Sequence, residues 1–159
     1  EEKAKKRNAN IIAYLYTPGF SSDNSSFTSP DLDGAAAKLS MRNALKNNDV
    51  SFVNAHGTST PMGDEIEYNA IKEVLGNVPI VSNKSKIGHT FGACGFIEAI
   101  YTIKSLQSGQ IPDNHNITKC SFDTDGMITN KNRTTTGKKA LNNSFGFGGK
   151  CSSQLIEIL

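Results

Sequence analysis

Two histidines, His56 and His89, have the surroundings in this chain that best suit chemistry. His56 follows a short apolar run and precedes small polar residues, and α/β proteins commonly place ligand sites where a strand ends. His89 follows Gly88 at the start of an expected helix, whose positive dipole end disfavours an imidazolium. We therefore expect His89 to be a neutral imidazole that donates a hydrogen bond. By contrast, His115 lies in a polar stretch and is expected to be exposed.

Two charged residues accompany His89. Lys84 comes five residues before it, and Glu98 comes nine residues after it. A buried lysine needs a counter-charge, and only tertiary folding could bring these two side chains together. The alternative is that Lys84 is a surface lysine.

The helix that must hold His89 is expected to run from Thr90 to Ser108, with Gly109 closing it. Each helical glycine costs roughly 1 kcal/mol against alanine, so glycines there need a reason. Close approach of another backbone is that reason, and the helix is expected to be buried. Residues at helical spacing form two stripes on this helix. The apolar stripe is Phe91, Cys94, Ile97 and Tyr101, and the small-residue stripe is Gly92, Gly95 and Ala99.

The remaining elements follow from hydrophobic period and turn residues. Two more helices are expected, Asp33 to Lys46 and Asp64 to Leu75, the second with Asp64 as its N-cap. Long irregular stretches are expected at Thr17 to Pro30 and at Ile111 to Gly137. The expected strands are Asn10 to Tyr16, Val50 to Asn54, Pro79 to Ser82, Ala140 to Asn143 and Ser152 to Leu159.

Strands and helices alternate along most of the chain, and the last two strands form a hairpin around Gly146 to Gly149. This order predicts an α/β fold in which a mixed β-sheet carries helices on its faces. The 159 residues are enough for one domain with a hydrophobic core.

Composition excludes several classes of function. A net charge of +2 is too small to indicate nucleic-acid binding. No apolar run reaches about 18 residues, so no membrane span is expected. The cysteines Cys94, Cys120 and Cys151 have no metal-ligand spacing, and their odd number favours a reducing compartment over a disulfide framework.

Three motifs occur in the order that a known family shows. They are NAHGTSTPMGD (residues 54–64), NKSKIGHTFGACGFIEAI (residues 83–100) and NSFGFGG (residues 143–149). The sequence resembles the C-terminal half of β-ketoacyl-acyl carrier protein synthases, the elongating ketosynthases of the thiolase superfamily. The resemblance implies the C-terminal half of a thiolase-like fold, with residues 1–159 as a C-terminal ketoacyl-synthase domain.

The resemblance also implies roles for the charged and imidazole side chains. His56 and His89 become a catalytic pair whose hydrogen bonds stabilise the oxyanion formed when a malonyl thioester loses carbon dioxide. Neither imidazole requires a metal for this role. Lys84 joins the catalytic set, with Glu98 as its supporting partner.

Substrate-binding roles follow from the same motifs. Thr58 and Thr60 are implied to hydrogen-bond the phosphopantetheine arm of the substrate, although an ordinary turn with side-chain caps is the alternative. Phe145 is implied to be a gate that moves when an acyl chain enters, and Phe147 joins it as a substrate-binding residue. An apolar strand anchor is the alternative for Phe145. The loop from Thr17 to Pro30 lies near the substrate entrance in this family, or is a plain solvated connection.

The sequence departs from the family at several positions. The condensing nucleophile of the family is a cysteine in the N-terminal half, which these residues do not include. Cys94 lies on the small-residue stripe and is expected to be a core cysteine. Lys150 and Cys151 stand where the family usually has Thr-Asn.

The whole enzyme implied by this resemblance joins an acyl group to malonyl-acyl carrier protein by decarboxylative Claisen condensation, in fatty acid or polyketide biosynthesis. Its expected partners are acyl carrier protein, the N-terminal ketosynthase half and a second copy as a homodimer. It needs no resident cofactor, because the substrate carries phosphopantetheine. It is expected in the cytoplasm or in an organelle lumen. One alternative is a non-catalytic partner, such as a chain-length-determining or scaffolding half-subunit. A degradative thiolase is another, but that family uses a second cysteine in a different C-terminal motif.

Overall fold

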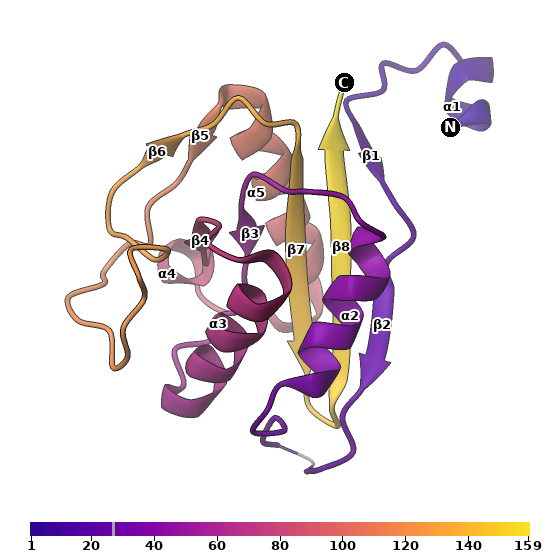
Figure 1. Cartoon of the computed structure of the whole chain (residues 1–159). Coiled ribbons are helices and arrows are strands. Elements are labelled where there is room, and N and C mark those ends of the chain that lie inside the picture. The colour runs from indigo at the N-terminus through magenta and orange to yellow at the C-terminus, as the bar shows by residue number, and fades with distance from the viewer. Residues whose placement is uncertain (27) are drawn as a thin grey trace.

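A mixed β-sheet with helices on both faces forms the centre of the molecule, as a computed structural model describes it for residues 1–26 and 28–159 (Figure 1). β3 pairs in parallel with both β4 and β7, whereas β8 pairs antiparallel with β7, β1 and β2. The predicted α/β class and mixed sheet are therefore confirmed. In spatial order the strands are β1 (Ala13–Leu15), β8 (Lys150–Ile158), β7 (Lys139–Gly146), β3 (Val53–Asn54) and β4 (Ile80–Val81), with β2 (Gly19–Ser22) also paired to β8.

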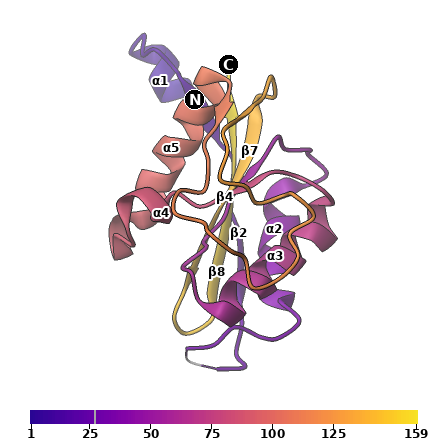
Figure 2. The ribbon, with the colours of Figure 1, turned by 90° about the vertical axis from the view of Figure 1, so that its left-hand side faces the viewer.

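Helices cover the sheet on two sides. α2 (Ala35–Leu45) and α3 (Pro61–Leu75) lie on one face, and α5 (Cys94–Ser108) lies on the other (Figure 2). The described residues also form five short elements: the helices α1 (Glu2–Lys6) and α4 (Lys84–Ile87), the 3-10 helix η1 (Phe91–Ala93), and the paired strands β5 (Gln110–Ile111) and β6 (Arg133–Thr134).

Two apolar clusters fill the layers on either side of the sheet. On the α2 side, Met41, Ile71 and Leu155 are fully buried, and on the α5 side Phe52 and Ile156 are buried to within about 1%. Residues of a strand alternate between the two sheet faces, which is why neighbours such as Leu155 and Ile156 enter different clusters. The predicted inner face of α2 is confirmed, because all four of its residues are buried: Ala37, Met41, Ala44 and Leu45.

The start of α3 differs from the prediction. The helix begins at Pro61, with Thr60 as its N-cap residue, so Asp64 is not the N-cap. Proline suits the first helical position because its fixed φ is already helical and its missing N–H is not needed there. Asp64 instead accepts a 3.1 Å hydrogen bond from the backbone N–H of Ser59.

The helix after His89 also differs from the prediction. α5 begins at Cys94, and a 3-10 turn over Phe91–Ala93 separates it from His89, so His89 is not at the α-helix start. A Cβ added at Gly92 would meet nothing within 4 Å, and one at Gly95 would meet the Ser144 side chain at 3.1 Å. The expected close backbone is therefore absent among the described residues.

Nor is α5 buried all round. Cys94 is buried, as predicted, but Phe96 is 80% exposed and Ile100 is 58% exposed. Phe91, just before the helix, is 78% exposed, and Tyr101 of the expected inner stripe is 36% exposed. One side of α5 packs on the sheet, while its opposite side carries large apolar groups that no described residue covers.

Both stretches predicted to be irregular contain strands. β2 lies within residues 17–30, and β5 and β6 take up the ends of the region around residues 111–137. Gly19 allows β2 to lie against α2, because a Cβ there would stand 2.0 Å from the Ser40 carbonyl oxygen. These strands lack an alternating apolar pattern, and their pairing partners are far away in the sequence.

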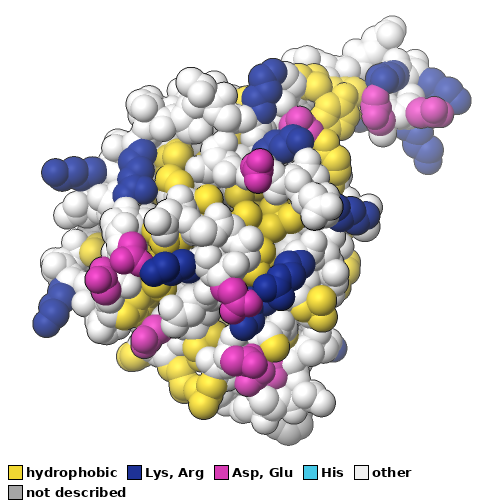
Figure 3. All heavy atoms as spheres, viewed as in Figure 1, with side chains coloured by type: hydrophobic (Ala, Val, Ile, Leu, Met, Phe, Trp, Pro, Cys, Tyr) yellow, Lys and Arg dark blue, Asp and Glu magenta, His cyan; other side chains and the backbone are white. Residues whose placement is uncertain are grey.

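The α2–α3 face carries lysine, arginine and acidic side chains interspersed among apolar ones (Figure 3). Within residues 1–26 and 28–159, no helix combines the length and the apolar composition that crossing a membrane requires.

Candidate functional site

His56 follows the short parallel strand β3 and is held by a buried carboxylate from α3. The backbone N–H groups of His56 and Gly57 donate 2.9 Å hydrogen bonds to Oε1 and Oε2 of Glu67. The Asn143 side chain donates to Oε1 of Glu67 at 3.0 Å. Glu67 is only 5% exposed, and burial raises the pKa of its carboxyl while these N–H donors oppose that rise. Glu67 therefore fixes the backbone of the loop that carries His56.

His89 lies opposite His56. Their ring centroids are 5.6 Å apart and the rings meet edge to face. Nδ1 of His89 accepts a 3.1 Å hydrogen bond from the backbone N–H of Phe91. A neutral imidazole with Nδ1 as acceptor carries its proton on Nε2, so His89 is left with one ring N–H to donate. This backbone hydrogen bond, rather than a helix dipole, selects the tautomer.

The charge state of His56 follows from its surroundings. Burial lowers the pKa of His56 to about 3, and the nearby Lys84 and His89 add to the effect. An imidazole with this pKa is neutral at physiological pH, so His56 is a hydrogen-bond donor or acceptor there and not a cation. Both histidines thus have the chemistry of oxyanion-stabilising donors.

Lys84 and Glu98 form a buried ion pair between α4 and α5. Lys84 Nζ lies 2.5 Å from Glu98 Oε1, and the two side chains are 6% and 0% exposed. Lys84 is therefore not the surface lysine that was the alternative. A buried ion of either sign is costly without its partner, which makes each residue dependent on the other.

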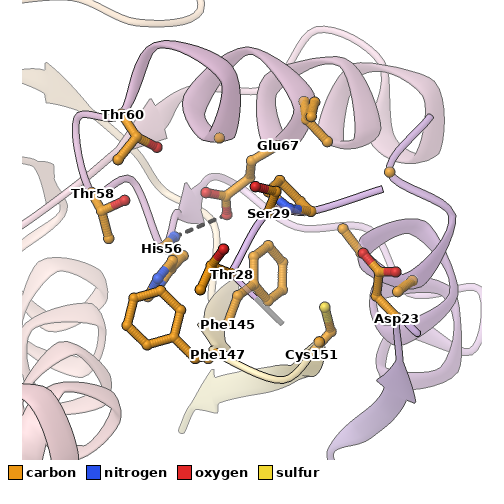
Figure 4. Close-up of a pocket in the computed structure, with 18 of the residues that line it drawn as sticks. Asp23, Thr28, Ser29, His56, Thr58, Thr60, Glu67, Phe145, Phe147 and Cys151 are labelled. Carbon is orange, nitrogen blue, oxygen red and sulfur yellow. Dashed lines mark hydrogen bonds between the residues drawn. The ribbon is translucent and has the colours of Figure 1, made fainter. Parts of the chain in front are cut away.

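The residues predicted to bind substrate surround one cavity of about 550 Å³ (Figure 4). The ring of Phe145 lies 5.7 Å from the ring of His56, centroid to centroid. Phe147, on the hairpin turn, is 81% exposed at the rim. Six of the predicted site residues line this cavity: His56, Thr58, Thr60, His89, Phe145 and Phe147. Lys84 and Glu98 do not line it.

Lys84 instead lines a second cavity of about 590 Å³ on the other side of the loop that carries Thr58 and Thr60. Thr58, Thr60 and His89 line both cavities, so the loop after His56 separates the first cavity from the second. Asn114 stabilises the wall of this second cavity. Its side chain accepts a 2.7 Å hydrogen bond from the Ser82 N–H and donates one of 2.9 Å to the Ile80 carbonyl.

Glu67 is the functional residue that the sequence analysis missed. The available signal was its spacing, because Glu67 shares the inner face with Ala70 and Ile71, which are 1% and 0% exposed. An acidic residue on the buried stripe of a helix needs hydrogen-bond partners, and these are the backbone groups at His56.

The loop that follows β2 also reaches the cavity. Asp23, Thr28 and Ser29 are among its lining residues, so this stretch is near the site and not only a solvated connection. His115 is exposed, as predicted, and lies outside this cavity. In the described part of the chain, no three His, Cys, Asp or Glu side chains are grouped to hold a metal ion.

Comparison with known proteins gives one consistent result. Residues 12–118 match the family described as "Beta-ketoacyl synthase, C-terminal domain". The chain is 41% identical to a 3-oxoacyl-[acyl-carrier-protein] synthase homolog of Saccharomyces cerevisiae, over 98% of this chain and 40% of that protein. It is 39% identical to 3-oxoacyl-[acyl-carrier-protein] synthase 2 of Vibrio harveyi, over 98% of this chain and 40% of that protein. The chain thus spans about two fifths of the length of these relatives.

Solved structures agree with the sequence comparison. A β-ketoacyl synthase from Burkholderia phymatum matches with a TM-score of 0.85 and 33% identity, over 100% of this chain and 40% of that one. A second match is a chain of the structure described as a type II PKS acyl-carrier protein in complex with its ketosynthase. Its TM-score is 0.91 and its identity 31%, over 99% of this chain and 41% of that one.

Proposed function

Because this chain belongs to the β-ketoacyl synthase family as a C-terminal domain, we propose that it supplies half of the active site of a decarboxylating condensing enzyme. The observation that carries the proposal is the meeting of His56 and His89 in a cavity that Phe145 also lines. The reaction joins an acyl group to malonyl-acyl carrier protein and releases carbon dioxide.

The two histidines act on the malonyl thioester. Its terminal carbon–carbon bond breaks, carbon dioxide leaves, and the electron pair moves into an enolate whose charge rests on the thioester oxygen. His56 and His89 donate hydrogen bonds to that oxygen. The enolate carbon then attacks the acyl thioester of the enzyme, and the cysteine thiolate leaves. Neutral imidazoles suit this step, and the low pKa of His56 supports that assignment.

Lys84 and Glu98 position this pair and do not line its cavity. The positive charge of Lys84 favours neutral His56. Thr58 and Thr60 hydrogen-bond the phosphopantetheine arm, and Phe145 gates the space where the acyl group enters.

The nucleophilic cysteine belongs to an N-terminal half that assembles with these residues. Cys94 is 5% exposed in the core, and burial raises the pKa of Cys151 to about 11, so neither has the character of a reactive thiolate. The apolar outer side of α5, with Phe96 and Ile100, is the surface on which the other half packs.

We further propose acyl carrier protein as the substrate carrier and a homodimer as the assembled form. A ketosynthase of similar fold is known in complex with its acyl-carrier protein, which supports the first of these partners. The cellular location is the cytoplasm or an organelle, and one relative is a mitochondrial 3-oxoacyl-[acyl-carrier-protein] synthase of Arabidopsis thaliana. A chain-length-determining half-subunit is the second candidate, because another similar structure is "The ishigamide ketosynthase/chain length factor".

The test combines the chain with its nucleophile-bearing half, as one polypeptide or as two. Acyl- and malonyl-carrier thioesters are supplied, and ketoacyl product and carbon dioxide are measured. We expect turnover from the assembly and none from this chain alone. Assembly without turnover would favour the chain-length-determining subunit, and turnover by this chain alone would refute the need for a second half.

A further inference from the structure

Ser153 on β8 carries a fully buried hydroxyl that lies outside the cavity lined by the two histidines. Its register partner across the hairpin is Asn143 of β7, and Ser153 Oγ donates a 2.8 Å hydrogen bond to Asn143 Oδ1. An amide oxygen can only accept, so the single proton of the Ser153 hydroxyl is committed to this contact. Ser153 therefore determines which end of the Asn143 amide faces β8.

The other end of the Asn143 amide contacts Glu67. Asn143 Nδ2 donates at 3.0 Å to Glu67 Oε1, the same oxygen that accepts the 2.9 Å hydrogen bond from the His56 N–H. Asn143 is fully buried and Glu67 is 5% exposed. With the amide reversed, Asn143 Oδ1 would face the carboxylate, and two buried acceptors would meet without a proton between them. The amide is thus held in one orientation from both ends.

Helix α2 holds the Ser153 hydroxyl from its far side. Ser40 Oγ lies 3.0 Å from Ser153 Oγ, and Ser40 is fully buried as well. Because the Ser153 proton goes to Asn143, the Ser153 oxygen is left as the acceptor for Ser40, whose own proton is shared with the Ala37 carbonyl oxygen at 2.9 Å. Consecutive buried hydrogen bonds strengthen one another. They connect α2, β8, β7 and α3 to the backbone of His56 through four side chains: Ser40, Ser153, Asn143 and Glu67.

We propose that Ser153 is a positioning residue for decarboxylation, because its hydroxyl holds the Asn143 amide on Glu67 and Glu67 holds the backbone of His56. The inference rests on the proposed function, in which His56 stabilises the malonyl oxyanion. Without the hydroxyl, Asn143 Oδ1 loses its donor and the amide turns more freely, since its terminal torsion is broad.

A freer amide weakens the contact with Glu67. The Asn143 hydrogen bond is one of those that oppose the rise in the Glu67 pKa on burial. A carboxyl that has taken up a proton no longer accepts equally at both oxygens, so its hold on the adjacent N–H groups of His56 and Gly57 loosens. The effect reaches the imidazole through the backbone and not through contact with substrate.

The experiment uses the assembled enzyme with Ser153→Ala, and carbon dioxide release from malonyl-carrier thioester is measured separately from acyl transfer to the cysteine. We expect carbon dioxide release to fall by about 10- to 100-fold, because misplacing a catalytic group by about 1 Å can cost about 100-fold. Acyl transfer stays within about threefold of wild type, since it does not use the His56 donor.

Ser153→Thr and Ser153→Val separate the hydroxyl from packing. Threonine and valine have nearly the same shape, so strain from the added methyl group is common to both, whereas only threonine keeps a donor for Asn143. We expect Ser153→Thr to release carbon dioxide at least about tenfold faster than Ser153→Val. Ser152→Ala is the matched control, because this neighbour on β8 points to the opposite face of the sheet, and both of its activities should match wild type.

Three results would overturn the proposal while an active wild-type assembly upholds the proposed function. They are wild-type carbon dioxide release in Ser153→Ala, an equal loss of release and transfer in that variant, and equal release by the threonine and valine variants. The same selective loss in Ser152→Ala would also overturn it. Absence of carbon dioxide release from the wild-type assembly would refute the proposed function itself.

Discussion

The backbone N–H of His56 donates a 2.9 Å hydrogen bond to Oε1 of Glu67, a carboxylate that is 5% exposed. The neighbouring N–H of Gly57 occupies Oε2 at 2.9 Å. Glu67 is therefore the residue whose chemistry most directly fixes where His56 stands.

Glu67→Gln keeps the shape of the side chain but sets an amide N–H₂ against one of these donors. Because the group is buried, we expect a loss of about 1–3 kcal/mol in the free energy of unfolding, measured by denaturant titration of the assembled enzyme. Decarboxylation falls as well, because His56 is displaced. Glu65→Gln, at an exposed position of the same helix, is the control. Equal stability of the two variants would show that the Glu67 contacts contribute little.

His89→Ala removes one preorganised donor to the developing oxyanion. Loss of such a donor typically costs about 100- to 1000-fold in rate, so carbon dioxide release and condensation should both fall by about that factor. Acyl transfer to the cysteine remains measurable, because its oxyanion forms elsewhere. Labelled acyl transfer and carbon dioxide release are followed separately. The assignment fails if the variant loses acyl transfer but keeps carbon dioxide release.

His56 makes stability depend on pH in a defined direction. Its pKa is about 3 in the folded chain and about 6.5 in the unfolded chain, so the unfolded state binds more protons between these values. The free energy of unfolding therefore declines as pH falls from about 6.5 toward 3. His56→Gln should show a shallower decline over this window in denaturant titrations at several pH values. An unchanged slope would contradict the low pKa, and His115→Gln, at an exposed position, serves as the control.

Phe145→Ala removes the proposed gate. In the assembled enzyme we expect altered acyl loading or chain-length selection, because the ring lines the cavity and its centroid lies 5.7 Å from that of His56. Decarboxylation of a bound malonyl extender survives better, since both histidines remain. The two half-reactions are assayed with carrier thioesters. Equal loss of every step would identify Phe145 as a structural anchor of β7.

The exposed apolar side of α5 gives a prediction for the chain by itself. Phe96 and Ile100, at 80% and 58% exposure, should make the isolated chain associate or bind a hydrophobic dye. Ile100→Glu should reduce both effects and also prevent assembly with the N-terminal half. Leu39→Glu, on the opposite face at α2, is the control with 51% exposure. A monomeric wild-type chain that binds no dye would refute the prediction.

The sequence by itself determined the elements whose pattern is local. α2 has an apolar stripe at helical spacing, and the hairpin of β7 and β8 has its glycine-rich turn, so both were predicted. Ordered motifs identified the family and predicted the site residues His56 and His89, which the structure brings together. By contrast, β2 and β6 escaped prediction because their pairing with β8 and β5 compensates for weak local preference.

Only the tertiary structure decided which side chains meet. Lys84 and Glu98 are 14 residues apart on different helices, and their pairing depends on how α4 and α5 pack against the sheet. Glu67 of α3 reaches the backbone of His56 in the loop after β3, a contact that no spacing rule contains. Exposure of Phe96 likewise depends on which side of α5 the sheet covers, since an apolar residue in a helix suits a core and an interface equally well.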